Sequence, residues 1–103
     1  MSIFLNMSIF PIDKGASVSQ YVSRVIKMID DSGANYQLNS MGTTIETETM
    51  PEALRMVQNA YDVLKDDSKR IYCTITMDIK EGAKGRMKEK IASIENKIGI
   101  VKK

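Results

Sequence analysis

Hydrophobic and polar residues alternate along two segments of the chain, residues 3–10 and 71–79. Alternation with a period of two predicts β-strands with one face turned toward a core. We expect inward side chains at Ile3, Leu5, Met7 and Ile9, and at Ile71, Cys73, Ile75, Met77 and Ile79. Pro11 should end the first strand, because it cannot donate to a ladder. An inward Cys73 would be a buried, inert thiol.

Two intervening segments follow the helical period instead. Their apolar stripes are Val18, Tyr21, Val22, Val25, Ile26 and Ile29, and then Met50, Leu54, Val57, Tyr61 and Leu64. Ser17 with Gln20, and Thr49 with Glu52, have capping-box spacing and predict where the helices begin. Gly33 is a natural left-handed stop for the first helix. A further stripe of Met87, Ile91, Ile94 and Ile98 predicts a last helix that ends at Gly99.

Between the first two helices, residues 36–48 read as a hairpin turning near Met41, with Tyr36, Leu38 and Ile45 inward. The order strand, helix, strand, strand, helix, strand is the split βαβ pattern of the ferredoxin-like fold. Right-handed crossovers place both helices on one face of an antiparallel sheet. We therefore predict an α+β, ferredoxin-like βαββαβ domain over residues 1–103, with an extra C-terminal helix.

The opposite face of this sheet should be mostly polar. Its members would be Phe4, Asn6, Ser8, Phe10, Thr44, Glu46, Glu48, Tyr72, Thr74, Thr76 and Asp78. One interpretation is a solvated face, which antiparallel sheets commonly have. The aromatic residues among hydroxyls and carboxylates favour an interface or a ligand site instead. If two such faces packed together, Glu46 would need a cation or donors from outside the chain.

Composition removes several classes of function. The chain has 103 residues, a net charge of +2, one cysteine and no histidine. Histidine-dependent triads, histidine metal sites and an internal disulfide are therefore excluded. A nucleic-acid binder would show a basic stripe, and a membrane protein a long apolar run. We expect a cytoplasmic protein that binds neither nucleic acid nor membrane and holds no metal or cofactor.

Three blocks read together resemble a known family. "SIFPIDKGASVSQYV", "SGANYQLNSMGTTIE" and "KRIYCTITMDI" are similar, in order and spacing, to blocks of the UPF0045 family of thiamine-binding proteins. Ser40 stands where the family has proline. The resemblance implies a ferredoxin-like protein that binds thiamine or its hydroxymethylpyrimidine part without turnover. It also implies a homodimer that assembles into a homotetramer through sheet packing.

The resemblance and the residue chemistry together predict a ligand-binding set. Glu46 could accept from an aminopyrimidine or offset a thiazolium charge, and Met41 could form an apolar wall. Ser17 and Ser19 lie at a helix start, which suits an anion, although capping alone accounts for Ser17. The full predicted set is Ser8, Ser17, Ser19, Met41, Thr43, Thr44, Glu46, Thr74 and Asp78.

Two other functions stay open on the sequence. The chain could be an oligomeric structural or regulatory module whose polar face is only an assembly interface. It could also be an enzyme acting on a thiamine breakdown product, with Glu46 or Asp78 as acid or base. We expect binding without catalysis.

Overall fold

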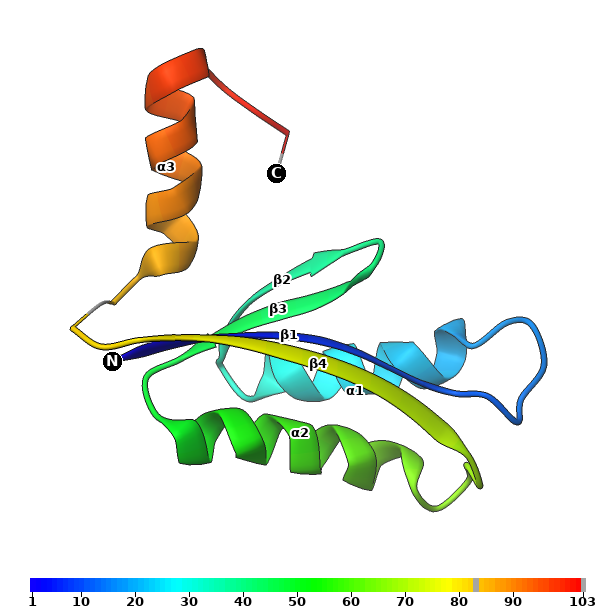
Figure 1. Ribbon diagram of the computed structural model, residues 1–103. Coiled ribbons are helices and arrows are strands. Elements are labelled where there is room, and N and C mark those ends of the chain that lie inside the picture. Colours follow the sequence, from blue (N-terminus) through cyan, green and yellow to red (C-terminus); the bar gives the residue numbers. More distant parts are fainter. Residues whose placement is uncertain (83, 103) are drawn as a thin grey trace.

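The computed structural model describes residues 1–82 and 84–102. Figure 1 shows two helices packed on one side of a sheet and a third helix extending away from the other side. The elements are β1 (Ser2–Pro11), α1 (Ser19–Asp31), β2 (Asn35–Asn39), β3 (Gly42–Thr47), α2 (Met50–Leu64), β4 (Ile71–Lys80) and α3 (Arg86–Ile98). Among the helices of the described residues, none is long and apolar enough to cross a membrane.

The sheet has the strand order β2-β3-β1-β4, and every neighbouring pair is antiparallel. This order confirms the ferredoxin-like fold, with β1 and β3 in the centre. Phe4 lies opposite Glu46 on β3 and opposite Asp78 on β4. Directly opposed residues share a face, so the predicted polar face of β1, β3 and β4 forms one surface, which we call the outer face.

The core lies between the sheet and the helices α1 and α2. Ile3, Leu5, Met7 and Ile9 of β1 are buried, as the alternation predicts. Ile45 of β3, Val25 and Ile29 of α1, and Ala53, Ala60 and Leu64 of α2 complete it. Thr49 caps α2 as predicted, since its side chain accepts a hydrogen bond from the Glu52 amide.

The predicted stripe of α2 is partly wrong. Leu54 is 53% exposed and Tyr61 is 49% exposed, whereas Ala53 and Ala60 are fully buried. The small alanine side chains face the sheet because they let the helix backbone approach it closely. Leu54 and Tyr61 therefore lie on the flank of the helix, whereas Leu64 of the same stripe is buried as predicted.

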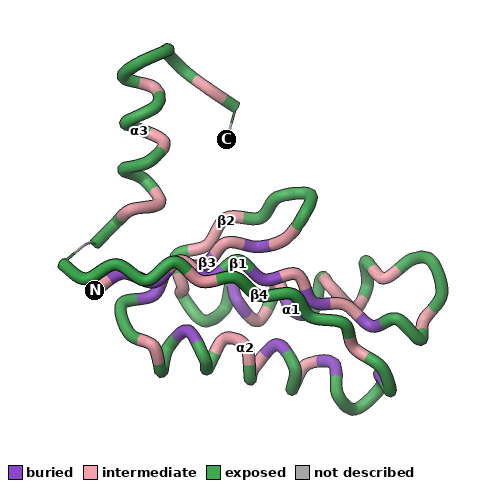
Figure 2. Tube along the Cα trace, viewed as in Figure 1, coloured by how far each residue is buried: buried purple, intermediate pink, exposed green. Residues whose placement is uncertain are grey.

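The prediction of an inward apolar row on β4 also fails in part. Ile71 and Met77 are half-buried, but Ile75 is 37% exposed, Ile79 is 49% exposed, and Cys73 is exposed. Figure 2 shows the strand exposed along most of its length. The reason is position, because β4 is an edge strand and neither helix covers it fully. The predicted burial of the Cys73 thiol is wrong for the same reason.

Two local predictions need correction. No side chain among the described residues caps α1, whose N-cap is Val18, and Ser17 is exposed before it. The carbonyl of Val18 accepts from the amides of Tyr21 and Val22. Val18 is half-buried, and α1 forms without a side-chain cap, which is worth about 1 kcal/mol where it is present. Leu38, predicted inward, is 56% exposed because β2 is the other edge strand.

Candidate ligand-binding site

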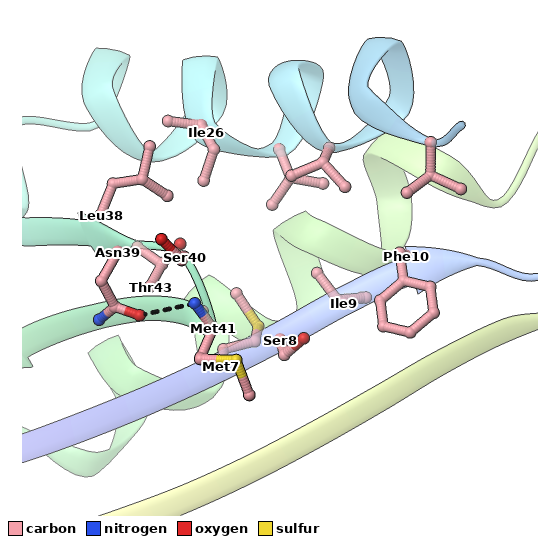
Figure 3. Close-up of a pocket in the computed structure, with 14 residues that line it drawn as sticks. Met7, Ser8, Ile9, Phe10, Ile26, Leu38, Asn39, Ser40, Met41 and Thr43 are labelled. Carbon is pink, nitrogen blue, oxygen red and sulfur yellow. Dashed lines mark hydrogen bonds between the residues drawn. The ribbon is translucent and has the colours of Figure 1, made fainter. Parts of the chain in front are cut away.

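A cavity of about 270 Å³ lies between α1, the far end of β1 and the β2–β3 hairpin. Figure 3 shows Ile26 and Leu38 on one side of it and Met7, Ser8 and Ile9 on the other. Val18 and Val22 of α1 and residues 39–43 of the hairpin complete the lining. The cavity is thus built from three segments that are distant in the sequence.

The strand register creates this cavity. β3 pairs with β1 only from Ile3 to Met7, whereas β1 continues to Pro11. The edge of β1 beyond Met7 therefore faces the space under the hairpin. Gly42 begins β3 at this point, and a Cβ atom there would lie 3.0 Å from the backbone oxygen of Met7. Glycine is required because neither backbone can move away easily.

The lining is apolar with a polar rim. Hydroxyl groups come from Ser8, Ser40 and Thr43, and an amide comes from Asn39. Asn39 is oriented by accepting, through Oδ1, from the backbone N–H of Met41 at 2.9 Å. All the residues that line the cavity are described, and none of them is charged. Such a site suits a neutral ring with hydrogen-bonding groups at its edge.

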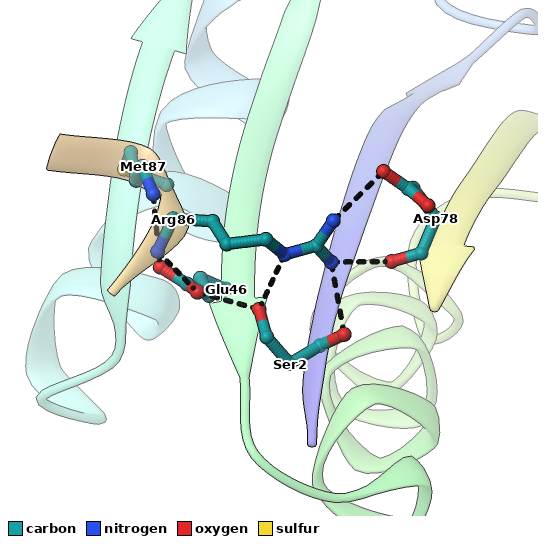
Figure 4. A network of polar contacts seen from close by, with 5 residues as sticks. All are labelled: Ser2, Glu46, Asp78, Arg86 and Met87. Carbon is teal, nitrogen blue, oxygen red and sulfur yellow. Dashed lines mark hydrogen bonds and ion pairs between the residues drawn. The ribbon is translucent and has the colours of Figure 1, made fainter. Parts of the chain in front are cut away.

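Glu46 lies elsewhere, in a polar cluster at the end of the outer face (Figure 4). Its carboxylate accepts from the Ser2 hydroxyl at 2.6 Å and from the backbone amides of Arg86 at 2.9 Å and Met87 at 3.2 Å. Asn35 adds a longer contact of 3.4 Å. The carboxylate therefore caps the N-terminus of α3, where amides and the helix dipole favour negative charge.

Arg86 completes this group, which we call the Glu46 cluster: Ser2, Glu46, Asp78, Arg86 and Met87. The Arg86 guanidinium donates to the Ser2 hydroxyl and backbone oxygen and to the Asp78 backbone oxygen, and it forms an ion pair of 2.9 Å with the Asp78 carboxylate. It also lies 4.5 Å from the centroid of the Phe4 ring. Its side chain is only 12% exposed, so the cluster holds α3 against the sheet.

The electrostatics of Glu46 follow from these contacts. Burial raises the pKa of the carboxyl, but the hydrogen bonds from Ser2, Arg86 and Met87 and the Arg86 charge lower it by more. The pKa of Glu46 consequently lies below its ordinary value, and the carboxylate is ionised. Our expectation that its partner must come from outside the chain is wrong, because the start of α3 supplies the donors.

The predicted ligand-binding residues divide between several places. Ser8, Met41 and Thr43 line the cavity, and Ser19 lines an adjoining groove between α1 and β2. Thr44 lies on the outer face and donates to Asn6 at 3.3 Å, and Thr74 lies opposite Ser8. Glu46 and Asp78 belong to the Glu46 cluster, and Ser17 is exposed before α1.

Comparison with known proteins places the chain in a family. The family model described as "Thiamine-binding protein" matches residues 5–95. The chain belongs to the thiamine-binding protein family. The UPF0045 protein Mb1933 of Mycobacterium bovis is 30% identical to it over 95 residues, covering 92% of this chain and 93% of the relative.

Solved structures agree on the fold of this thiamine-binding family member. The hypothetical protein MJ1052 of Methanocaldococcus jannaschii superposes with a TM-score of 0.79 at 27% identity, over 90% of this chain and 95% of the other. A protein of Thermotoga maritima, assigned provisionally to thiamine biosynthesis or salvage, gives a TM-score of 0.78 at 21% identity, over 91% and 99% of the two chains. At that identity the likeness shows the fold.

Sequence reasoning missed several residues that shape this family member's sites. Arg86 reads as one of the alternating charges of a solvated helix, and Ser2 as the start of a strand. No pattern links them to Glu46, because the three are far apart in the chain. Val22 and Ile26 are predicted as core residues, and they also form a wall of the cavity. The first turns of α1 pass over the part of β1 that is not paired with β3. Val22 and Ile26 therefore face the cavity there.

Proposed function

We propose that this protein binds thiamine or its hydroxymethylpyrimidine part, without chemical turnover, in the cavity between α1 and the hairpin. One observation carries the proposal: separate blocks of the family resemblance line this one cavity. Ser8 comes from the first block, as do Val18 and Val22, and Met41, Gly42 and Thr43 come from the second. Family membership supports the ligand class.

The dimensions and chemistry of the cavity suit the pyrimidine half of thiamine. Its volume of about 270 Å³ is close to the lower end of small-molecule pockets, about 300 Å³, so it holds a single ring. An aminopyrimidine presents an amine donor beside a ring-nitrogen acceptor. The hydroxyl of Thr43, which pairs with the inward-facing Met7, can both donate and accept, and the edge of β1 supplies backbone groups.

The same cavity offers nothing to a cation, because no charged residue lines it. The thiazolium ring is therefore expected to remain at the mouth, near Met41, which is 84% exposed. This arrangement replaces the role predicted for Glu46. Thiamine and the free hydroxymethylpyrimidine should bind with similar affinity, and the isolated thiazole alcohol should bind weakly.

Titration calorimetry and thermal shift with these three compounds test the proposal. A ligand at a hundred times its Kd raises the free energy of unfolding by about 2.7 kcal/mol. Val22→Phe should fill the cavity and abolish the shift. Ser23→Phe, one residue further along α1 and exposed, is the matched control. Absence of binding by thiamine and by the pyrimidine at millimolar concentration would reject this function and favour a module that only assembles.

We also propose that copies of the chain assemble through the outer face, as the resemblance implies. The outer face carries Phe10 and Tyr72, whose ring centroids are 6.0 Å apart, with Tyr72 57% exposed. The helices α1 and α2 lie on the other side of the sheet (Figure 1). Light scattering of Tyr72→Glu should show a smaller assembly than the unmodified protein.

A further inference from the structure

Thr43 carries a hydroxyl group into the apolar side of the ligand cavity. It pairs with Met7 of β1 and with Leu38 of β2. Directly opposed residues share a face of the sheet, and Met7 is buried in the core. The side chain of Thr43 therefore lies on the helix side of the sheet, where Val22 and Ile26 of α1 also line the cavity (Figure 3).

The other polar residues of the cavity are in contact with solvent. Asn39 and Ser40 are exposed and Ser8 is half-buried, whereas Thr43 is only 4% exposed. A polar group of a ligand that lies beside Thr43 loses its contact with bulk water. It then needs a hydrogen-bond partner from the protein, because an unpaired polar group in an apolar site is costly.

The Thr43 hydroxyl is free to be that partner. In the part of the chain that the structure describes, no hydrogen bond involves its side chain. The other threonines of β3 are engaged, because Thr44 donates to Asn6 at 3.3 Å and Thr47 donates to the backbone oxygen of Thr49 at 3.1 Å. Every fully enclosed side-chain nitrogen or oxygen of the described residues has a partner. The Thr43 oxygen is consequently not fully enclosed, and it opens into the cavity that it lines.

A hydroxyl in this position does not help the fold. Replacing an unpaired buried polar group by an apolar group of the same shape is nearly neutral or stabilising. Valine has the branched shape of threonine without the oxygen, and it would fill the same space at Thr43. A side chain that gives up stability in this way is typical of a functional site.

We propose that the Thr43 hydroxyl donates a hydrogen bond to a ring nitrogen of the bound pyrimidine, and that this contact determines which ring the cavity accepts. The inference rests on the proposed function and names the group that recognises the ligand. A ring nitrogen that enters the cavity exchanges a bond to water for the bond to Thr43. A carbocyclic ring of the same size leaves the hydroxyl unpaired and binds less tightly for that reason.

Calorimetry with two compounds tests this role. One is hydroxymethylpyrimidine, and the other is its benzene analogue, in which C–H groups replace both ring nitrogens and every substituent is kept. The unmodified protein should bind the pyrimidine about 10-fold more tightly, or better. Thr43→Val should weaken pyrimidine binding by about 10-fold and abolish or reverse the preference. Thr43→Ser keeps the hydroxyl and should retain the preference.

Thr47 provides the matched control. It is 5% exposed, lies on the same face of β3 two residues further on, and its hydroxyl has a partner within the protein. Thr47→Val should therefore lower the denaturant midpoint of the ligand-free protein and leave the ligand preference unchanged. Thr43→Val should not lower the midpoint. Circular dichroism confirms that each variant is folded.

The outcomes separate this inference from the proposed function. If Thr43→Val still prefers the pyrimidine as strongly as the unmodified protein does, the inference is wrong and the proposed function stands. An equal fall of the denaturant midpoint in both valine variants would also overturn the inference, because the Thr43 hydroxyl would then stabilise the fold. Failure of the unmodified protein to bind the pyrimidine or thiamine would reject the proposed function, and the inference with it.

Discussion

Replacing Glu46 by glutamine should release the N-terminus of α3 without harming the ligand cavity. The carboxylate accepts from the amides of Arg86 and Met87 through different oxygens. A glutamine side chain has one oxygen, so its amino group would face one of these N–H groups. One donor therefore loses its acceptor, although the shape of the side chain is kept.

The size of the effect follows from the contacts. An unsatisfied donor costs about 1–3 kcal/mol, and partial access to water places this one at about 1–2 kcal/mol. That energy corresponds to a 5- to 30-fold change in the population of the open form. None of the residues of α3, all of which are described, is buried. The loss should consequently appear in α3 and not in the core.

Hydrogen exchange of the unliganded protein measures this directly. Amides of residues 86–98 should exchange 5- to 30-fold faster in Glu46→Gln, while those of β1 and β3 stay unchanged. Glu48→Gln, the exposed glutamate two residues along, is the control. Equal exchange of α3 in both variants would refute the role of the cluster. Loss of thiamine binding in Glu46→Gln but not in Glu48→Gln would indicate that Glu46 binds the ligand.

Three further results are expected. Gly42→Ala should lower the free energy of unfolding by about 1–3 kcal/mol and weaken ligand binding, because its Cβ would meet the Met7 backbone at 3.0 Å; denaturant titration and calorimetry measure both. Thr49→Ala should cost about 1 kcal/mol by removing the α2 cap, and Thr49→Ser should restore most of it in the same titration. Stability should also fall in acid. For Asp67, the hydrogen bond from Arg24 lowers the pKa below 3.8, and the pKa of Glu46 lies below 4.5. A carboxyl group whose pKa is lower in the folded than in the unfolded protein stabilises the fold at pH values above its unfolded-state pKa. This contribution is lost as the pH falls through the folded-state pKa. Unfolding free energy should therefore drop below about pH 4.5, less steeply in Glu46→Gln; an equal slope in both proteins would contradict this account.

Local patterns were enough to predict the elements. The alternation in β1 and the stripe in α1 report which side chains avoid water, and the Thr49 cap marks where α2 begins. Their order led to the ferredoxin-like fold, because right-handed crossovers leave few alternatives. Three of the cavity residues, Ser8, Met41 and Thr43, belong to the set predicted from the family resemblance and the residue chemistry together.

The sequence by itself determined the strands, the helices, their order and the family, because each depends on contacts within a short stretch or on the order and spacing of three sequence blocks. Tertiary structure alone decided that β1 extends beyond the end of β3, which opens the cavity, and that the start of α3 contacts Glu46. It also decided that the apolar residues of α2 and β4 divide between core and surface. A hydrophobic pattern states that a side chain prefers burial, and only the packing of distant segments fixes what covers it.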